Sequence, residues 1–411
     1  MDRNQLIEEY PVGTMFDNEE LDALRRVLES GDALTRGPDV VLFENEFASY
    51  CGAKHAVAVS SCGAALNIAT KILGLGPEDE VICQANAFWA TFVHLLERGV
   101  LLKCADIDPY SLNIDPTGIE RLITKKTKAI YLVHQGGNPA DLEAIYRVAR
   151  THGLKVVEDC AHAVGAEYKG RKIGCDSDIA CFSFSTHKNI STLGEGGMVV
   201  TNNESYAEMA RGLRTNFPFG VKVKRNVPSL GEYHKPKSQA FMHAGDAWDY
   251  DWLKTNEFGS TFRMSTPQAA VGRVQLKKLD KHINLRQIIA EKYNEVIDGI
   301  NGLRKVSVLP DCRNAWYLFS FFIRPEAGVN RDNFINYLEF ECGIKTVLRY
   351  WPIHLGGIMR MHGHNLGECP NCERVWFKEQ MSLPISPQMM GEEIDRISEA
   401  IQLAFRTLQN R

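Results

Sequence analysis

The chain has 411 residues, with 47 Lys and Arg against 51 Asp and Glu, a formal net charge of −4 and 44% hydrophobic residues. This length and composition fit a globular protein with one large α/β unit or two domains. The slightly acidic balance argues against a nucleic-acid-binding protein, and no apolar run reaches the roughly 18–20 residues needed to cross a bilayer.

The first residues of the chain and its cysteines bear on the cellular compartment that we expect for the protein. The first residues, MDRNQLIEEYPVG, are acidic and lack the apolar stretch of a signal peptide. The 11 cysteines are scattered and odd in number, which predicts free buried thiols rather than a disulfide framework. We therefore expect a cytoplasmic protein, most simply an enzyme, with no membrane association.

Short apolar runs alternate with helical patterns between about residues 17 and 215. Repeated βα units of this kind predict a mostly parallel sheet with right-handed crossovers. Ligands of such sheets bind beyond the carboxyl ends of the strands. The β-branched content and short length of the apolar runs predict buried strands at 55–60, 80–83, 101–106, 129–134, 155–158, 179–183 and 198–201.

The pattern changes after residue 215. The segment 216–257 is rich in Pro, Gly, Lys and aromatic residues without sustained periodicity, which predicts an ordered functional loop. Beyond it we expect a long helix at 267–303, a strand at 315–324, a helix at 331–342 and a last helix from residue 391. This mixed order predicts a smaller α+β domain at 261–411, packed with residues 1–14, after a large domain at 15–260.

The most informative motif is SFSTHKNISTLGEGG at 183–197, directly after an apolar strand. A lysine in a polar turn at the carboxyl end of a strand, held in a dry pocket, is a competent Schiff-base nucleophile. Lys188 is therefore a candidate catalytic residue. Taken by itself, an ordinary surface lysine in a glycine turn is the commoner case.

An acid follows the strand predicted at 155–158. In VVEDCAH, Asp159 comes 29 residues before Lys188. A carboxylate at this strand exit can pair with a protonated pyridine nitrogen, which is the partner that the electron-sink chemistry of pyridoxal phosphate (PLP) needs. A helix N-cap, worth about 1 kcal/mol, is the alternative for Asp159.

Two further strand exits carry candidate cofactor contacts. The small residues of SSCGAAL at 60–66 precede a helix, whose N–H groups and dipole favour a phosphate, although a generic tight turn would look the same. Phe88 follows the strand at 80–83 and could stack on a planar cofactor ring, although core packing is commoner for a single aromatic.

Together these features resemble the DegT/DnrJ/EryC1/StrS family of PLP-dependent sugar aminotransferases. The resemblance implies an α/β fold of the fold-type-I, aspartate aminotransferase-like class, with a mostly parallel seven-stranded sheet flanked by helices. It covers nearly the whole chain, through TRGPDVVLFENEFASYCGAKHAVAVSS, EDCAHAVGAEYKGRKIG, SFSTHKN, GEGGMVVTNN, FRMSTPQAAVGRVQLKKLD, RYWPIHL and MSLPISPQMMGEEIDRI.

The resemblance implies a role for each candidate residue. Lys188 would hold PLP as a covalent Schiff base, and Asp159 would pair with the pyridine nitrogen. His162 lies where the family has Gln or His near the phenolic oxygen of the ring, and Phe88 matches the stacking aromatic. The phosphate-binding positions that the resemblance implies are Ser183, Gly63 and Ala64, with Cys62 at the border of the turn.

Some positions depart from the family pattern. The family usually has Thr at the position of Gly63, so a hydroxyl contact to phosphate is missing. Its usual Asn-x-Arg-Met reads TFRM here, and that Asn typically reaches the phosphate in the partner subunit, a contact left to Thr261. Five basic residues of the segment 216–257 either close over an anionic substrate or form a solvated face: Lys222, Lys224, Arg225, Lys235 and Lys237.

The implied activity is an aminotransferase with two half-reactions. The donor would be glutamate or glutamine and the acceptor a keto-sugar or keto-cyclitol, in antibiotic, amino-sugar or surface-polysaccharide biosynthesis. The family also implies a homodimer with shared active sites, without a nucleic-acid partner. The alternatives are another PLP reaction, such as sugar dehydration or an aminohydroxybenzoate-type synthesis, and a non-catalytic PLP-binding regulator. Dehydratase relatives replace the Schiff-base lysine with His, so Lys188 counts against that branch.

One further group of residues has metal-ligand chemistry. The family has a Gly-rich loop and a Pro-x-x-Glu helix start at this place, which residues 370–373 match, so we expect no metal. Zinc is the alternative, because the residue types and spacing are suitable in His362, His364, Cys369 and Cys372.

Overall fold

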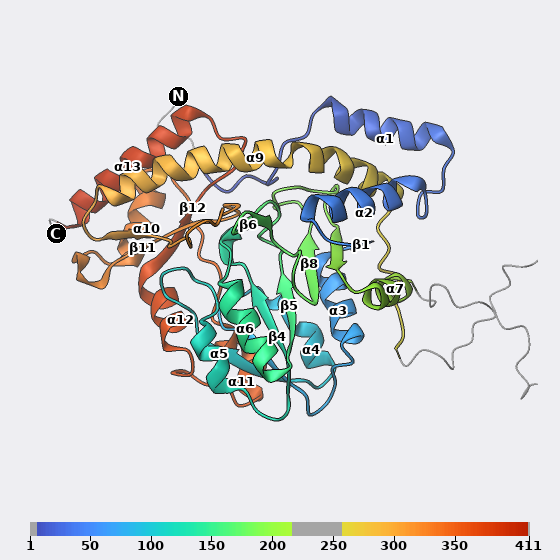
Figure 1. Ribbon diagram of the computed structural model, residues 1–411. Coiled ribbons are helices and arrows are strands. Elements are labelled where there is room, and N and C mark those ends of the chain that lie inside the picture. Colours follow the sequence, from blue (N-terminus) through green and yellow to red (C-terminus); the bar gives the residue numbers. More distant parts are fainter. Residues whose placement is uncertain (1–5, 216–256, 410–411) are drawn as a thin grey trace, which may run out of the picture.

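The computed structural model describes residues 6–215 and 257–409 (Figure 1). Residues 216–256, with the five basic side chains of that segment, lie outside the described residues. The helices are α1 (Asn18–Ser30), α2 (Pro38–Cys51), α3 (Cys62–Ile72), α4 (Val93–Glu97), α5 (Pro116–Leu122), α6 (Leu142–His152), α7 (Glu204–Leu213), α9 (Thr266–Asp298), α10 (Arg331–Phe340), α11 (Gly357–Met361), α12 (Pro370–Arg374) and α13 (Gly391–Gln409).

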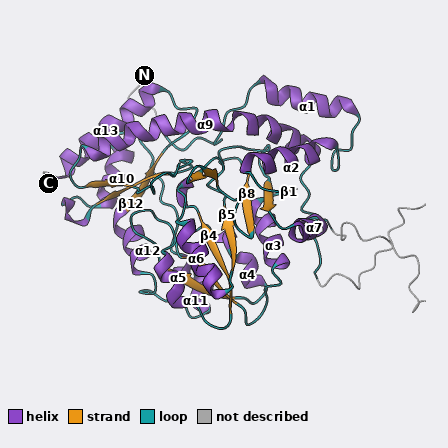
Figure 2. Ribbon diagram, viewed as in Figure 1, coloured by secondary structure: helices purple, strands orange, loops and turns teal. Residues whose placement is uncertain are grey.

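Two main sheets and one short hairpin complete the described part (Figure 2). The strands are β1 (His55–Val59), β2 (Glu80–Gln84), β3 (Leu101–Ala105), β4 (Thr127–Val133), β5 (Lys155–Asp159), β6 (Glu167–Tyr168), β7 (Arg171–Lys172), β8 (Ile179–Ser183), β9 (Gly197–Thr201), β10 (Leu303–Lys305), β11 (Phe319–Ile323) and β12 (Gln380–Leu383).

The large sheet has seven strands in the order β1-β9-β8-β5-β4-β2-β3. Strand β9 runs antiparallel to both of its neighbours, and the remaining pairs are parallel. These are the seven strands predicted from the apolar runs, so the mostly parallel seven-stranded sheet is confirmed. The strands read as continuous apolar runs because helices cover both faces of the sheet.

Alternate residues of each strand face opposite helical layers. Val57 and Val59 of β1 pack in one core with α3, α4 and α7, whereas Ala56 and Ala58 pack in a second core with α2, α6 and the first half of α9. This is the two-residue period of a strand buried on both sides. In sheets of this kind, ligands bind beyond the carboxyl ends of the parallel strands.

A second, antiparallel sheet of β10, β11 and β12 forms a separate core with the second half of α9, α10 and α13. The start of the described chain packs here too, because Ile7 bridges Ile344 and the Tyr10 hydroxyl donates to Glu393. Helix α9 runs along the top of the molecule and joins both cores (Figure 1). The domain limits at 15–260 and 261–411 remain a prediction.

Two predicted ends were wrong, for local physical reasons. Helix α9 stops at Asp298 rather than 303, because Gly302 adopts a φ of +118° and Leu303 pairs with Ile323 in the small sheet. The strand predicted at 315–324 covers only β11, because the N–H groups of residues 315 and 318 donate to the carbonyls of Gly137 and Gly136 instead of a strand.

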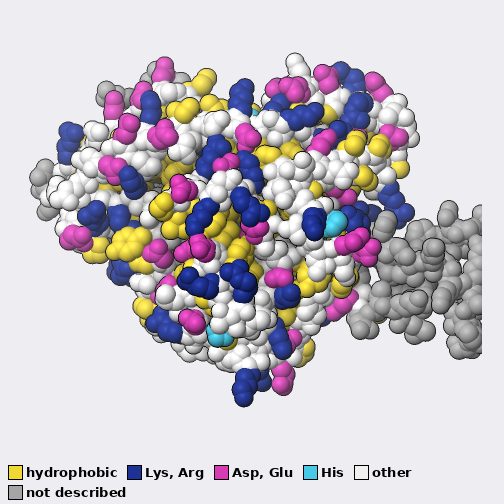
Figure 3. Space-filling model, viewed as in Figure 1, with side chains coloured by type: hydrophobic (Ala, Val, Ile, Leu, Met, Phe, Trp, Pro, Cys, Tyr) yellow, Lys and Arg dark blue, Asp and Glu magenta, His cyan; other side chains and the backbone are white. Residues whose placement is uncertain are grey.

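Helix α9 begins at a helix-start signal in the sequence. Ser265 is its N-cap, and the side chain of Gln268 completes a capping box, with a proline in the first turn. Within the described ranges, none of the helices is long and apolar enough to cross a membrane. Basic and acidic side chains are interspersed over the face in Figure 3, as the near-neutral net charge predicts.

Candidate functional site

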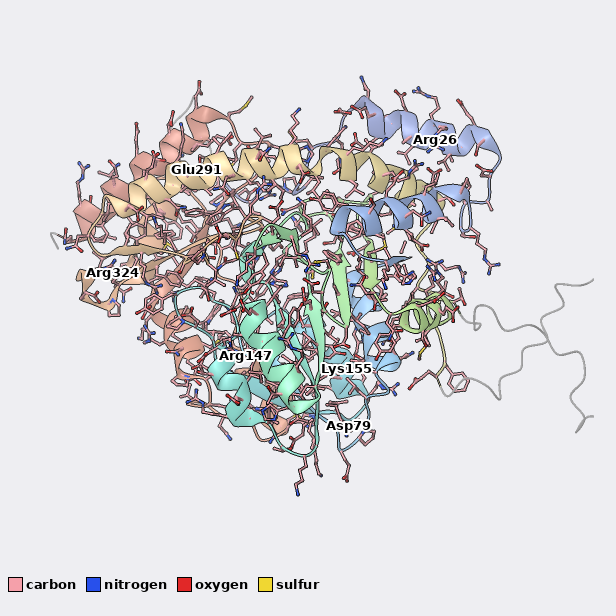
Figure 4. The ribbon with its side chains drawn as sticks, in the orientation of Figure 1. Arg26, Asp79, Arg147, Lys155, Glu291 and Arg324 are labelled. Carbon is pink, nitrogen blue, oxygen red and sulfur yellow. The ribbon has the colours of Figure 1, made fainter. Side chains whose placement is uncertain are left out.

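The candidate residues come together at the carboxyl ends of β1, β2, β5 and β8. These strand ends face the layer that contains α9, and the opposite rim holds Lys155 at the start of β5 and Asp79 just before β2 (Figure 4). Asp159 ends β5 and Ser183 ends β8, and these two strands are neighbours in the sheet. The topology therefore places these strand ends next to each other at one edge of the sheet.

Lys188 lies in the turn that follows β8, over an aromatic ring. Its Nζ is 4.0 Å from the ring centroid of Tyr317, a cation–π contact. The turn is fixed from the other side by Gly13, whose N–H donates to the carbonyl of Thr186. A Cβ on Gly13 would lie 2.0 Å from the carbonyl oxygen of His187, so only glycine lets this segment approach the lysine turn.

Asp159 is buried and held by hydrogen bonds. Its Oδ1 accepts from the N–H of Ala161 at 3.0 Å, and its Oδ2 accepts from the hydroxyl of Thr91 at 2.7 Å. Burial raises the pKa of the Asp159 carboxyl, against the opposing effects of these hydrogen bonds and of the Lys188 ammonium. Asp159 is therefore a preoriented carboxylate whose charge a cationic partner would stabilise.

His162 stacks between two tyrosines. Its ring centroid is 4.4 Å from that of Tyr317 and 5.5 Å from that of Tyr350, and its Nε2 is 3.1 Å from the Tyr350 hydroxyl. Its Nδ1 is buried and has no hydrogen-bond partner among the residues described. Burial, with the positive charges of Lys188 and Arg349, lowers the pKa of His162 well below its usual value, so the ring is neutral.

The predicted phosphate turn is the first turn of α3. Ser61 is the N-cap, and its hydroxyl accepts from the N–H of Ala64 at 3.1 Å. A Cβ on Gly197 of β9 would lie 2.4 Å from the carbonyl carbon of Ser61, so this glycine lets the strand pack directly under the turn. Cys62 is buried, with its Sγ 3.8 Å from Asp159 Oδ1, and thus links the turn to the carboxylate.

The other three predicted contacts lie at the border of this arrangement. Phe88 is 54% exposed, and its ring centroid lies 5.6 Å from that of Tyr350. Ser183 Oγ accepts from the N–H of Ser185 at 3.4 Å. Thr261 is exposed, and it precedes Phe262, whose carbonyl accepts from Ser60 N–H next to the start of α3.

Sequence reasoning missed a polar network around Tyr317, the residue whose ring lies under Lys188. Arg349 donates from Nη1 and Nη2 to the two carboxylate oxygens of Glu9, at 2.8 and 2.5 Å, and from Nη1 to the Tyr317 hydroxyl at 3.3 Å. Burial raises the pKa of Tyr317, but the charges of Lys188 and Arg349 outweigh it, so the net shift is downward. Arg349 belongs to the segment RYWPIHL, but nothing in the neighbouring sequence indicates that this segment lies near Lys188.

Among the described residues, the structure does not bring the four residues of the zinc alternative into one ligand set. Cys369 and Cys372 are buried in the apolar core, and His362 is exposed on a surface turn. Among the described residues, the ligand-type atoms that lie within 4.8 Å of His364 are those of Cys104 and Glu368, where hydrogen bonds account for the contact. The four residues with suitable spacing therefore do not form one site.

One described hollow lies away from these residues. A cavity of about 850 Å³ lies between α6 and the hairpin β6–β7, lined by Tyr146, Lys169, Arg171 and Asp178 among others. Its lining does not include Lys188 or Asp159. The candidate site is therefore defined by its chemistry-bearing groups and not by this cavity.

The chain is similar to known proteins over nearly its whole length. The model of the DegT/DnrJ/EryC1/StrS aminotransferase family matches residues 14–402. The spore coat polysaccharide biosynthesis protein SpsC of Bacillus subtilis is 38% identical, over 94% of this chain and 95% of its own length. A dTDP-3-amino-3,4,6-trideoxy-alpha-D-glucose transaminase of Streptomyces venezuelae is 34% identical, over 92% of this chain and 90% of its own length.

A solved structure agrees with these relatives. The crystal structure of S. venezuelae DesV in complex with a ketimine intermediate superposes with a TM-score of 0.79, at 32% identity, and the match covers 94% of each chain.

Proposed function

The chain belongs to the DegT/DnrJ/EryC1/StrS aminotransferase family, and from this membership we propose that it is a PLP-dependent enzyme that transfers an amino group from glutamate or glutamine to a keto-sugar or keto-cyclitol. The observation that carries the proposal is the convergence of Lys188, Asp159 and His162 at one edge of the sheet. The choice of an amino-acid donor rests on the chemistry of Arg349 described below, and the choice of the acceptor rests on the family.

The residues at the site fit PLP. Asp159 is a buried carboxylate, so a pyridinium N–H would supply the positive partner that burial makes necessary. The buried Nδ1 of His162 is an orphaned polar atom beside it. The first turn of α3 offers backbone N–H groups and its positive dipole end to a phosphate. Lys188 would hold the cofactor covalently, and Phe88 would cover its ring.

When bound, the cofactor supplies an electron sink for the bond that breaks at the donor α-carbon. The donor amine would displace Lys188 from the cofactor, and the released Nζ would then take the proton from the donor α-carbon and deliver it to the cofactor. Tyr317 lies under that Nζ, so its ring stabilises the ammonium and limits where the lysine can move. Asp159 keeps the ring nitrogen protonated because Thr91 and Ala161 hold the carboxylate in place.

Arg349 is the group that we propose to bind the donor carboxylate. It already holds one carboxylate, that of Glu9, with two hydrogen bonds in the side-by-side geometry of an arginine–carboxylate pair. Its guanidinium also donates to the hydroxyl of Tyr317, and the ring of Tyr317 makes the cation–π contact with Lys188. An α-carboxylate that replaced Glu9 would therefore place the amino group of the donor toward Lys188.

The remaining elements of the proposal concern the assembly and its setting. We propose a homodimer in which Thr261, exposed beside the start of α3, contacts the phosphate of the partner's site. The division into domains at 15–260 and 261–411 belongs to this proposal, as does a role in antibiotic, amino-sugar or polysaccharide biosynthesis. All eleven cysteines are free thiols, which suits a cytoplasmic, reducing environment.

A screen of donors and acceptors tests the proposed reaction. Glutamate and glutamine should each be tested for their ability to bleach the absorbance of the lysine-bound cofactor near the visible edge. The aminated cofactor form should then be offered keto-sugars, keto-cyclitols and nucleotide-linked keto-sugars, with amination detected by mass. Bleaching by neither donor contradicts transamination, and release of water without gain of nitrogen would point to dehydration instead.

A further inference from the structure

We propose that His94 binds the phosphate of the cofactor at the first turn of α3, in the space that a side chain on residue 63 would otherwise fill. This role rests on the proposed use of PLP and adds a residue to its binding site. His94 belongs to α4, the short helix that follows Thr91 in the chain. None of the sequence motifs pointed to it.

The imidazole of His94 lies along the side of α3. Its Nδ1 is 3.1 Å from Asn67 Nδ2 and 3.3 Å from Glu97 Oε2. Its Nε2 is 3.7 Å from the position that a Cβ on Gly63 would occupy. Asn67 and Gly63 are four residues apart and so lie one turn apart on the same face of the helix. The imidazole therefore lies along α3 with Nδ1 at the second turn of the helix and Nε2 toward the first turn.

The contact of Nδ1 with Asn67 makes Nε2 a hydrogen-bond donor. If Nδ1 accepts from Asn67 Nδ2, the neutral ring carries its proton on Nε2. If Nδ1 instead donates to Glu97, Nε2 carries a proton only in the imidazolium form, because the neutral ring with its proton on Nδ1 leaves Nε2 as an acceptor. A phosphate at the helix start favours the forms that have an Nε2–H over that last form.

Gly63 is what leaves room for this contact. A Cβ there would meet only Ser61 Oγ and His94 Nε2 within 4 Å, each at 3.7 Å, so a side chain would fit without displacing the backbone. Gly63 lacks the hydroxyl expected at this position, and the imidazole reaches the same space. The side chain of His94 is 19% exposed, so it is partly shielded from water and its hydrogen bonds are worth more than on an open surface.

Cofactor binding to the cofactor-free protein tests this role without any turnover. The dissociation constants of PLP and of pyridoxal, which lacks the phosphate, are measured by absorbance. His94→Ala should weaken PLP binding about 10- to 100-fold, as expected for loss of a hydrogen bond to a charged group, and leave pyridoxal binding unchanged. Adding Gly63→Thr to His94→Ala should restore most of the PLP affinity. The control His152→Ala removes a partly exposed imidazole next to Glu120 and should change neither constant.

Several results would overturn the role. Equal losses for PLP and pyridoxal in His94→Ala would mean that the histidine only supports the fold, and an unchanged PLP constant would mean that it does not touch the phosphate. If His94→Ala does not fold, His94→Leu is measured instead, because leucine occupies the space without a hydrogen-bond donor, and the same ratio decides. A wild-type protein that binds neither compound overturns the cofactor assignment itself, which distinguishes that failure from the failure of His94 alone.

Discussion

Replacing Arg349 and replacing Glu9 should change donor binding in opposite directions. The two side chains form a bidentate ion pair, and each is only partly exposed, with 22% and 30% of the side-chain surface accessible. If Arg349 binds the donor carboxylate, Glu9 occupies its place until the donor arrives. Arg349→Gln then removes the binding group, whereas Glu9→Gln removes the competitor.

The size of the effect follows from the contact. A hydrogen bond to a charged group contributes about 1.5–3 kcal/mol, and the partial exposure of this pair favours the lower end of that range. Arg349→Gln should therefore raise the donor concentration at half-saturation about 10-fold or more. Glu9→Gln should lower it by up to about 10-fold, because the donor no longer displaces a carboxylate.

The assay is the first half-reaction, followed as the decay of the absorbance of the lysine-bound cofactor against glutamate concentration. The limiting rate should change little, because neither side chain acts on the α-proton. Lys345→Gln is the control, since it removes a surface charge paired at 3.6 Å with Glu8, the neighbour of Glu9. If Glu9→Gln weakens donor binding as Arg349→Gln does, the pair only holds the N-terminal segment and the reasoning is refuted.

Three further predictions concern single residues. Thr91→Val should raise the pKa of Asp159 further, because the hydrogen bond from the hydroxyl to the carboxylate is lost, whereas Thr91→Ser should leave that pKa unchanged. The measurement is an infrared titration of the protonated carboxyl in cofactor-free protein, with Asp159→Asn as the reference. Burial lowers the pKa of His282 to about 4, so stability should fall by up to about 3 kcal/mol as the pH drops from 6.5 toward 4, and urea unfolding of His282→Gln should lack this fall. Gly272→Ala in α9 should lower the free energy of unfolding by about 1–3 kcal/mol, because its Cβ would lie 2.7 Å from a buried phenylalanine ring. Gly299→Ala at the end of the same helix should leave stability nearly unchanged, and thermal melts compare the two variants.

The seven strands of the large sheet could be predicted because their burial leaves a direct mark on the sequence. Continuous apolar runs such as 179–183 occur where both faces of a strand are covered. The short strands β6, β7 and β10 leave no such mark, because two or three partly exposed residues form no pattern. Their positions depend on tertiary contacts, such as the pairing of Leu303 with Ile323.

The residues of the candidate site also fall into a group that could be predicted from the sequence and a group that could not. Lys188, Asp159 and the turn at 60–66 lie directly after strands, so the topology brings them together once the strands are known. Thr91 reaches Asp159 from an irregular turn after β2. Tyr317 and Arg349 come from the C-terminal part, and their approach depends on how that part packs against the strand ends. The zinc alternative shows the reverse error, since His362 and Cys369 are close in sequence but one is exposed and the other buried.

The most direct test of the central claim is to locate the cofactor on the chain. Protein incubated with PLP is reduced with borohydride, which makes the lysine linkage permanent, and is then digested and mapped by mass. The account predicts that the modified peptide contains Lys188 and that Lys188→Arg gives neither the absorbance nor the modified peptide. Modification of another lysine with full amino transfer retained in Lys188→Arg would contradict it.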